Sequence, residues 1–494
     1  MDAVESARSA DKDNAAPEKP EAEIADPVVR SHRIKIGSRA VSYTTTCGLM
    51  PIRNDKGELL AKLFFTAYSL NQPVATQTRP LTIAFNGGPG SSSVWLHMGG
   101  LAPKRVKMLP DGGMPRPPFE LVDNEFTWLD ATDIVFVDPV DTGFSRATSD
   151  DHGKIAKSMD GDLDYVAEFI RMYITRYNRW TSPLFLAGES YGTFRAAGLA
   201  GLMVEKGIAF NGIILISSIL NMQTARFTPG NDLPYSLFFP TYAATAWYHK
   251  MLMPTEQVKP IREFLDDVEE WVEQTYVPSL SLGDRISPEE LEKVVQGIVR
   301  FTGLSRDFVI QSDIRINIHQ FTKQLLRGQR KTVGRLDGRF TGYDRSGVTD
   351  EPDYDPSLNG IRPPFTSVLN QYIRTDLGFE SDAEYHILRG LDWTYGDAAK
   401  GYADTSDALR SAFAKNPYMH VFVASGYFDM ATPYYATYYT LSHSNISPDV
   451  YGNVETKEYP TGHMVYIDQG ALETLRDDVV GFIERALTGA KPPE

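Results

Sequence analysis

The stretch from Pro183 to Phe194 constrains this chain more than any other part of it. It begins with an apolar run, Leu184–Ala187, that is long enough for one buried strand, and residues 193–199 suit a helix. Between them lies Gly-Glu-Ser-Tyr-Gly at residues 188–192. A strand, the pattern G-x-S-x-G and a helix in this order indicate a nucleophile elbow, a strained turn that raises the hydroxyl of Ser190 above the sheet. The alternative is a tight turn with an ordinary serine.

The composition excludes several classes of function. The chain has 494 residues, 42% of them hydrophobic, which is enough for one large domain plus an insertion or a second domain. A net charge of −15 argues against nucleic acid, whose phosphates would be repelled. No apolar run reaches about 18 residues, so we expect no membrane span. Cys47 is the only cysteine, so an intrachain disulfide and a cysteine-rich metal site are excluded.

The alternation of strands and helices divides the chain into three predicted parts. Residues 1–28 are acidic and lack apolar periodicity, so we expect them to be disordered. Residues 29–220 and 417–490 form the predicted α/β core, a mostly parallel central sheet with helices on both faces. Residues 221–416 show several amphipathic helices and no clear buried strand, which predicts a helical cap that shapes the pocket.

The order of the predicted strands supports this division. A hairpin around the turn Asn54–Gly57 is followed by buried-type strands at Leu81–Phe85, Asp133–Asp138, Leu184–Ala187, Gly212–Ser217 and His420–Ser425. The first residues show no signal-peptide pattern, so the chain as given would be cytoplasmic, or periplasmic or secreted if a leader has been trimmed. The compartment and the oligomeric state are left open.

A serine nucleophile needs a base and a carboxylate that orients the base. In folds with a nucleophile elbow the order along the chain is Ser, then Asp or Glu, then His. Asp429 follows the strand that ends at Ser425, and His463 lies in a glycine-containing loop between the last strand and the last helix. None of the other histidines combines this order with a loop position. The alternatives are a surface capping carboxylate and a loop histidine with a structural role.

A glycine-rich loop, Asn86–Ser93, follows the strand Leu81–Phe85. The pair Gly87-Gly88 allows the main chain to approach a substrate carbonyl closely. The alternative is a loop that cradles phosphate, but no Lys-Ser or Lys-Thr follows it.

Four blocks together resemble the serine carboxypeptidases of peptidase family S10, a branch of the α/β-hydrolases. They are Asn86–Ser93, the stretch from Asp123–Trp128 to Asp138–Ser145, Gly188–Gly192 and Gly462–Val465, in the order of the family. Two further blocks, Gly230–Ser236 and Gly338–Gly342, resemble bacterial members. The resemblance covers about residues 80–470 and implies the α/β-hydrolase fold.

The resemblance assigns a role to each matching residue. The catalytic residues would be Ser190, Asp429 and His463. The oxyanion hole would consist of the N–H groups of Gly88 and Tyr191, and the substrate's terminal carboxylate would bind Asn86, Gly87 and Glu189. These roles imply a serine carboxypeptidase without metal or cofactor, favoured at acidic pH, whose partners are peptides with a free C-terminal carboxylate. The alternatives are an esterase or acyltransferase with the same triad, and a catalytically inactive binding module.

The chain also departs from the family pattern. Ser91 stands where many members have a cysteine, and Tyr427 occupies the first acidic position of a G-D-x-D motif, which leaves Asp429 as its only acid. After Asp138 the usual glutamine is missing, and Asp141 replaces a glycine. We therefore expect the pocket wall to differ near these positions.

Overall fold

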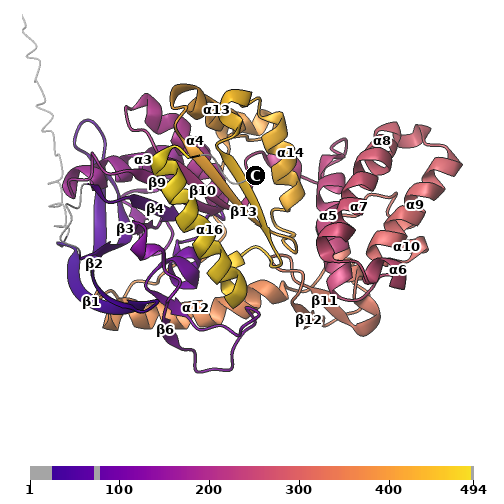
Figure 1. Ribbon diagram of the computed structural model, residues 1–494, viewed down its shortest axis with the longest axis horizontal. Helices are drawn as coiled ribbons and strands as arrows, with labels where there is room; N and C mark the ends of the chain where they lie inside the picture. The colour runs from indigo at the N-terminus through magenta and orange to yellow at the C-terminus, as the bar shows by residue number, and fades with distance from the viewer. Residues whose placement is uncertain (1–24, 72–77, 491–494) are drawn as a thin grey trace, which may run out of the picture.

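The computed structural model describes residues 25–71 and 78–490 (Figure 1). Most of the predicted disordered segment, residues 1–24, lies outside the described part of the chain. Within the described ranges the first strand begins at Val28, one residue before the predicted start of the core. The same ranges contain no helix that is both long and apolar enough to span a bilayer.

One large sheet forms the centre of the molecule. Its strands lie in the order β1-β2-β3-β7-β4-β9-β10-β13-β14, and β8 pairs with β3. From β7 to β14 all neighbours are parallel, whereas β1, β2, β3 and β7 are joined by antiparallel pairs. The strands are β1 (Val28–Ile36), β2 (Arg39–Arg53), β3 (Leu59–Leu70), β4 (Leu81–Phe85), β7 (Asp133–Val137), β8 (Arg146–Ala147), β9 (Leu184–Ser190), β10 (Gly212–Ser218), β13 (His420–Gly426) and β14 (Val454–Tyr459). The predicted mostly parallel sheet is confirmed.

The predicted strands and the predicted hairpin are present in this sheet. The turn after β2 contains a hydrogen bond from the Gly57 N–H to the Asn54 carbonyl oxygen, at 2.9 Å, and β3 returns antiparallel to β2. Strands β4, β7 and β10 are buried along their whole length, as continuous apolar strands are when both faces of a sheet are covered.

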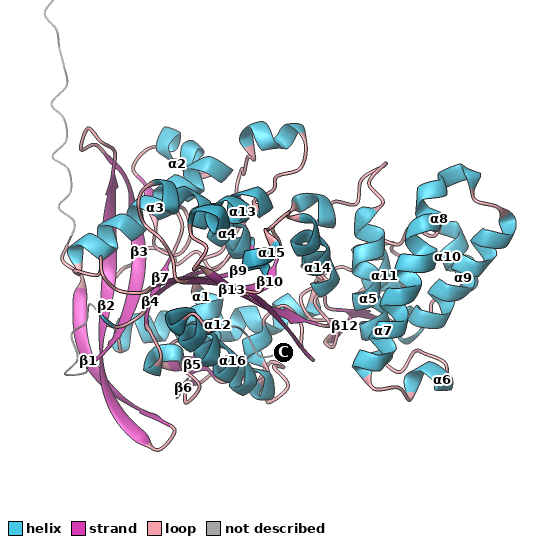
Figure 2. Cartoon of the chain, turned by 45° about the horizontal axis from the view of Figure 1, so that its top comes forward, coloured by secondary structure: helices cyan, strands magenta, loops and turns pink. Residues whose placement is uncertain are grey.

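Helices cover both faces of the sheet (Figure 2). On one face α3 (Met159–Arg176), α4 (Tyr191–Glu205) and α13 (Ser406–Lys415) pack through residues such as Phe169 and Phe413. On the other face α12 (Pro356–Thr375) and α16 (Gln469–Thr488) pack through Phe365 and Phe482. The short helices around the core are α1 (Val94–Leu96), α2 (Asp150–Ala156), α14 (Tyr434–His443) and α15 (Pro448–Tyr451), and the small sheet of β5 (Lys104–Val106) with β6 (Leu121–Asp123) contacts α12.

A second, helical body lies at one end of the sheet (Figure 1). It comprises α5 (Leu233–Tyr248), α6 (Pro254–Gln257), α7 (Ile261–Trp271), α8 (Val277–Leu282), α9 (Pro288–Thr302), α10 (Arg306–Gln311) and α11 (Ile318–Gln324), with the small sheet of β11 (Lys331–Val333) and β12 (Thr341–Tyr343). The sequence delimits these helices locally. For example, α9 begins with a capping box between Ser287 and Glu290 and ends at Gly303, whose φ of 67° is left-handed.

The packing divides the segment predicted as one cap. Helices α5 and α7 to α11 pack in one hydrophobic cluster, which also includes Phe428 and Met430 after β13, whereas α12 and α13 belong to the two clusters that flank the central sheet. The boundaries 221–416 stay a prediction, and we propose that the cap itself ends before α12. Amphipathic periodicity could not reveal this, because it shows that a helix has an apolar face but not what covers that face.

Candidate active site

The nucleophile elbow has the predicted form. Strand β9 ends at Ser190 and α4 begins at Tyr191. Ser190 has φ 59° and ψ −130°, a backbone conformation that typically costs a non-glycine residue about 1–3 kcal/mol. A Cβ atom on Gly188 would lie 2.2 Å from the Gly192 carbonyl oxygen, and one on Gly192 would lie 2.6 Å from the Phe85 carbonyl oxygen. Both glycines are therefore required by the close approach of strand, turn and helix.

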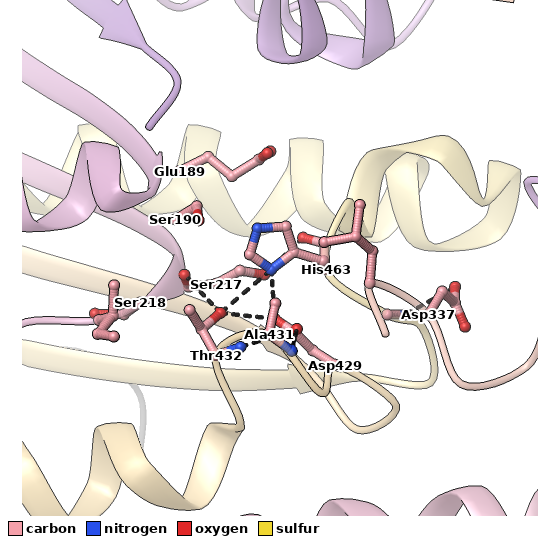
Figure 3. A network of polar contacts seen from close by, with 12 residues as sticks. Glu189, Ser190, Ser217, Ser218, Asp337, Asp429, Ala431, Thr432 and His463 are labelled. Atoms are coloured by element: carbon pink, nitrogen blue, oxygen red, sulfur yellow. Dashed lines mark hydrogen bonds and ion pairs between the residues drawn. The ribbon is translucent and has the colours of Figure 1, made fainter. Parts of the chain in front are cut away.

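Asp429 and His463 meet beside the elbow. The His463 Nδ1 atom lies 2.7 Å from Asp429 Oδ2, and both side chains are buried. Figure 3 shows that the other ring nitrogen of His463 faces Ser190. Ser190 and His463 also line the same two cavities. The structure thus brings together the three residues that the sequence predicts as catalytic.

Asp429 accepts hydrogen bonds from several donors besides His463. Its Oδ1 atom accepts from the N–H groups of Ala431 at 2.7 Å and Thr432 at 3.1 Å, and its Oδ2 atom accepts from the Thr432 hydroxyl at 2.7 Å. These donors fix the carboxylate so that the His463 Nδ1–H points at it and Nε2 is left as the basic nitrogen. Thr432 is a site residue that sequence reasoning missed.

Opposing effects act on the proton affinity of His463. Burial disfavours the charged imidazolium, but the negative charge of Asp429, its hydrogen bond and the charge of Glu189 outweigh burial and raise the His463 pKa. The ring is therefore a stronger base than an ordinary histidine. A general base of this kind is suited to take a proton from a hydroxyl group.

The backbone around His463 is held from two sides. The His463 N–H donates to the Leu336 carbonyl oxygen at 2.6 Å, and the Ser217 hydroxyl donates to the His463 carbonyl oxygen at 2.6 Å. The preceding residue, Gly462, donates its N–H to Asp337 Oδ2 at 3.1 Å. Leu336 and Asp337 lie between β11 and β12, just before the block Gly338–Gly342 for which the sequence suggested no role.

The glycine-rich loop packs against the elbow. A Cβ atom on Gly87 would lie 2.3 Å from the Tyr191 nitrogen, so the main chains are nearly in contact, and Gly88 has a φ of +104°. The predicted oxyanion donors, the N–H groups of Gly88 and Tyr191, are therefore close to each other. As the first residue of α4, Tyr191 also has an N–H with no acceptor within its helix.

A buried ion pair anchors this loop from behind. Arg195 and Asp162 are each at most 3% exposed and form a salt bridge of 2.7 Å. The Arg195 guanidinium also donates to the Asn86 carbonyl oxygen at 2.6 Å. Because a guanidinium has several donors in a rigid fork, one side chain connects α3 to the loop. The local sequence pattern around Arg195 does not indicate that it connects α3 to this loop.

Glu189 is buried and directly precedes Ser190 in the chain. Its Oε1 atom accepts from Asn86 Nδ2 at 3.0 Å, and its Oε2 atom accepts from the Tyr466 hydroxyl. Burial raises the Glu189 pKa to about 7, and the charge of Asp429 acts in the same direction. The charge of His463 and the hydrogen bonds from Tyr466 and Asn86 counteract part of this rise. The carboxyl group thus keeps its proton at mildly acidic pH.

Two cavities meet at Ser190 and His463. The smaller one, about 140 Å³, is lined by the predicted carboxylate-binding residues Asn86, Gly87 and Glu189 together with apolar side chains such as Trp95. The larger one, about 630 Å³, is lined by the elbow and by residues of the cap side, including those at the start of α11. A groove of about 740 Å³ between the cap and α14 contains none of the predicted site residues, so its size alone does not make it the site.

The positions that depart from the family pattern lie in different places. Ser91 lines the smaller cavity and accepts a hydrogen bond from the Trp95 indole at 2.8 Å. Tyr427 packs on Tyr434 in the hydrophobic cluster of the cap. Burial raises the Asp138 pKa to about 7. Asp141 lines a separate cavity with Lys157, 3.5 Å away.

Within the described ranges, no group of three or more His, Cys, Asp or Glu side chains is arranged to hold a metal ion.

Known proteins share parts of this sequence. The pheromone-processing carboxypeptidase KEX1 of Saccharomyces cerevisiae is 33% identical over 157 residues, which are 29% of this chain and 20% of that protein. Serine carboxypeptidase-like 36 of Arabidopsis thaliana is 30% identical over 168 residues, which are 33% of this chain and 32% of that protein. The chain therefore matches about a fifth to a third of the length of these relatives.

The fold has a solved counterpart. The crystal structure of KEX1(delta)p, a prohormone-processing carboxypeptidase from Saccharomyces cerevisiae, aligns with a TM-score of 0.52 and 17% identity. The alignment covers 89% of this chain and 91% of that chain, and it supports the α/β-hydrolase fold. The profile of the serine carboxypeptidase family, peptidase S10, matches residues 37–298, just over half of the chain. The chain therefore belongs to the serine carboxypeptidase family, peptidase S10.

Proposed function

We propose that this protein is a serine carboxypeptidase that releases C-terminal amino acids from peptides through an acyl-enzyme on Ser190. The observation that carries the proposal is the buried Glu189 carboxyl group, which is hydrogen-bonded to Asn86 and lines one cavity with the nucleophile. An ester without a carboxylate would have no need of an ionisable partner at this position. Membership of the family supports the same conclusion.

The proposed reaction begins at the elbow. His463 takes the proton of Ser190 as the serine oxygen attacks the carbonyl carbon, and returns it to the leaving amine, while Asp429 holds the imidazole in the required tautomer. The N–H groups of Gly88 and Tyr191 stabilise the oxyanion, and the loss of one such donor typically costs about 3–4 kcal/mol. Water then releases the acyl group from Ser190 by the same sequence of proton transfers.

Recognition of the substrate's terminal carboxylate follows from the protonation of Glu189. Two adjacent carboxylates repel each other, but a protonated carboxyl group donates a short, charge-assisted hydrogen bond to a carboxylate. With a Glu189 pKa of about 7, this bond is available at acidic pH and is lost as the pH rises. We therefore infer that peptide binding is favoured at acidic pH.

The two cavities suggest how the peptide lies. Only the smaller cavity is lined by Asn86, Gly87 and Glu189, so we assign it to the C-terminal residue that leaves. The larger cavity, which reaches the cap, would hold the acyl part of the substrate. Arg335 and Leu336, on the cap side, line both cavities, which makes them candidates for setting the side-chain preference.

Two further assignments belong to the proposal. The blocks Gly230–Ser236 and Gly338–Gly342 support a bacterial-type member of the family. An esterase or acyltransferase with the same triad is the alternative function, because these reactions also proceed through an acyl-serine.

Substrates that differ only at the C-terminus test the proposal. A blocked dipeptide, its C-terminal amide and its ester should be incubated with the protein and with Ser190→Ala. We expect the free acid to be cleaved far faster than the amide, and longer peptides to lose one residue at a time from the C-terminus. Ser190→Ala should lose turnover by about five to six orders of magnitude and should no longer react with a fluorophosphonate. Cleavage within the peptide, or of the ester alone, would contradict the proposal.

A further inference from the structure

A buried tyrosine contacts Glu189 but lines neither of the two cavities at Ser190. Tyr466 follows His463 by three residues, in the short helical turn Val465–Ile467, and is 1% exposed. Its hydroxyl donates a hydrogen bond to Glu189 Oε2, while Asn86 donates to Oε1. Both oxygens of the Glu189 carboxyl group are thus held by donors, and the group has one fixed orientation.

The fold provides a specific place for the tyrosine ring. It packs against Gly99 and Gly100, which lie in the helical turn His97–Leu101. A Cβ atom on Gly99 would lie 2.3 Å from Tyr466 Cε2, and one on Gly100 would lie 2.7 Å from Tyr466 Cβ. Glycine is unfavourable within a helical turn, and at these two positions the tyrosine side chain leaves no room for a Cβ atom.

Tyr466 is not one of the described residues that line the two cavities at Ser190. It therefore acts through another residue. We propose that Tyr466 is a positioning residue for the recognition of the substrate's carboxylate, because its hydroxyl orients the Glu189 carboxyl group and sets the pH range in which Glu189 keeps its proton. This inference rests on the proposed function and assigns part of it to a residue that does not touch the peptide.

The direction of the effect follows from the groups around Glu189. These are His463, Asp429, Asn86 and Tyr466, and a hydrogen bond donated by Tyr466 favours the ionised form of Glu189. Burial, followed by the charge of Glu189, raises the Tyr466 pKa well above its ordinary value, so the hydroxyl keeps its proton and stays a donor. Without the hydroxyl, the Glu189 pKa should rise, and the protonated form should persist to higher pH.

Tyr466→Phe tests this with little change in shape. The loss of a hydrogen bond to the charged carboxylate should raise the Glu189 pKa by about one pH unit. We expect the rise of the peptide KM with pH to begin about one unit higher than in the wild type. Tyr459→Phe is the matched control, because the Tyr459 hydroxyl donates to Asp478 at 2.7 Å and not to the site. An ester without a carboxylate should show no such shift in KM.

A second measurement needs no substrate. The infrared band of a protonated carboxyl group can be assigned to Glu189 by its disappearance in Glu189→Gln, and its titration followed in the intact protein. The midpoint should lie about one pH unit higher in Tyr466→Phe than in the wild type and in Tyr459→Phe. An unchanged or lower midpoint would overturn the inference. If the midpoint moves but the wild type cleaves no peptide, the proposed function fails while the action of Tyr466 on Glu189 stands.

Discussion

At the scale of single residues, two buried carboxyl groups near Ser190 have opposite surroundings. Asp429 accepts hydrogen bonds from two backbone N–H groups, a hydroxyl and an imidazole. Glu189 has fewer donors and is buried, which raises its pKa to about 7. Asp429 can therefore orient the base, while Glu189 keeps a proton for the substrate. Different surroundings commonly divide the acid and base roles of two carboxyl groups in this way.

The role of Asp429 leads to the first prediction. Asp429→Asn removes the acceptor for the His463 Nδ1–H and favours the wrong tautomer, so kcat on peptides should fall by about four orders of magnitude. Asp478→Asn on α16, which removes the carboxylate that accepts from Tyr459, is the control and should leave kcat within about twofold. If Asp429→Asn kept near-normal activity, another acidic residue would have to orient the histidine.

The second prediction concerns Glu189 and pH. In the wild type, the peptide KM should rise as the pH passes about 7, while kcat falls at low pH because protonated His463 cannot act as a base. Glu189→Gln donates a hydrogen bond at every pH, so its KM profile should be flat. A Gln variant with the wild-type slope would show that another group carries the effect.

The same substitution should change stability in a pH-dependent way. Because folding raises the Glu189 pKa from 4.5 to about 7, ionisation of Glu189 favours the unfolded state, and the fold loses stability as the pH rises through this window. At about pH 8, Glu189→Gln should be the more stable protein, by up to about 3 kcal/mol in the free energy of unfolding. At about pH 4 this advantage should be absent. Urea unfolding at both pH values measures the difference.

At the scale of elements, the connection between β11 and β12 joins the two loops that carry Asp429 and His463. In this connection, the Arg335 carbonyl oxygen accepts a hydrogen bond from the Met430 N–H at 3.0 Å, and the Gly338 N–H donates to the Phe428 carbonyl oxygen at 2.9 Å. Asp337 in the same connection accepts the Gly462 N–H. Two loops that are more than thirty residues apart in sequence are thus fixed to one short segment on the cap side.

The third prediction follows from this connection. Asp337→Ala removes the acceptor for Gly462 and a partner of Arg339, which lets the His463 loop move. Misplacement of a catalytic group by about 1 Å can cost about 100-fold, so kcat should fall by about 10- to 100-fold. Asp344→Ala is the matched control, since it breaks a buried ion pair with Lys323 in the same part of the chain, and the hydrogen bonds of Asp344 go to Lys323 and Asp353 rather than to the loops of Asp429 and His463. Equal losses of kcat in both variants would point to a general loss of cap structure.

The elements differ in how far the sequence predicts them. Strands such as β4 and β10 are recognisable because continuous apolar runs report burial on both faces locally. Ser190, Asp429 and His463 can be predicted because a motif and a fixed order along the chain point to them, and the structure places them together. Tyr466 and Asp337 were missed because their hydrogen-bond partners are 277 and 125 residues away, and no local pattern encodes such contacts.

At the scale of the whole molecule, the cap and the catalytic core share one hydrophobic cluster. Its members include helices α5, α7, α9 and α11 of the cap, and also Phe428 and Met430, which flank Asp429. Ile318 and His319, at the start of α11, line the larger cavity as well. The cap is therefore packed directly against the loop that carries Asp429, so a defect inside the cap should reach the candidate site.

The fourth prediction tests whether a defect in the cap reaches the site, by a substitution that creates a cavity in the cap. Phe321 on α11 is fully buried and stacks on Tyr242 with ring centroids 4.2 Å apart. Phe321→Ala should lower the free energy of unfolding by about 3–5 kcal/mol. The control is Phe169→Ala, an equally buried phenylalanine on α3 in the cluster between the sheet and helices α3, α4 and α13.

Both phenylalanine variants should lose comparable stability, but their activities should differ. At a temperature where both are fully folded, Phe169→Ala should keep its kcat on peptides, because none of the residues at Ser190 belongs to its cluster. Phe321→Ala should lose kcat, because relaxation of the cluster reaches Phe428 and Met430 and, through them, the position of Asp429. An unchanged kcat in Phe321→Ala would mean that the hydrogen bonds to Asp429 and to the connection between β11 and β12 hold the site without help from cap packing.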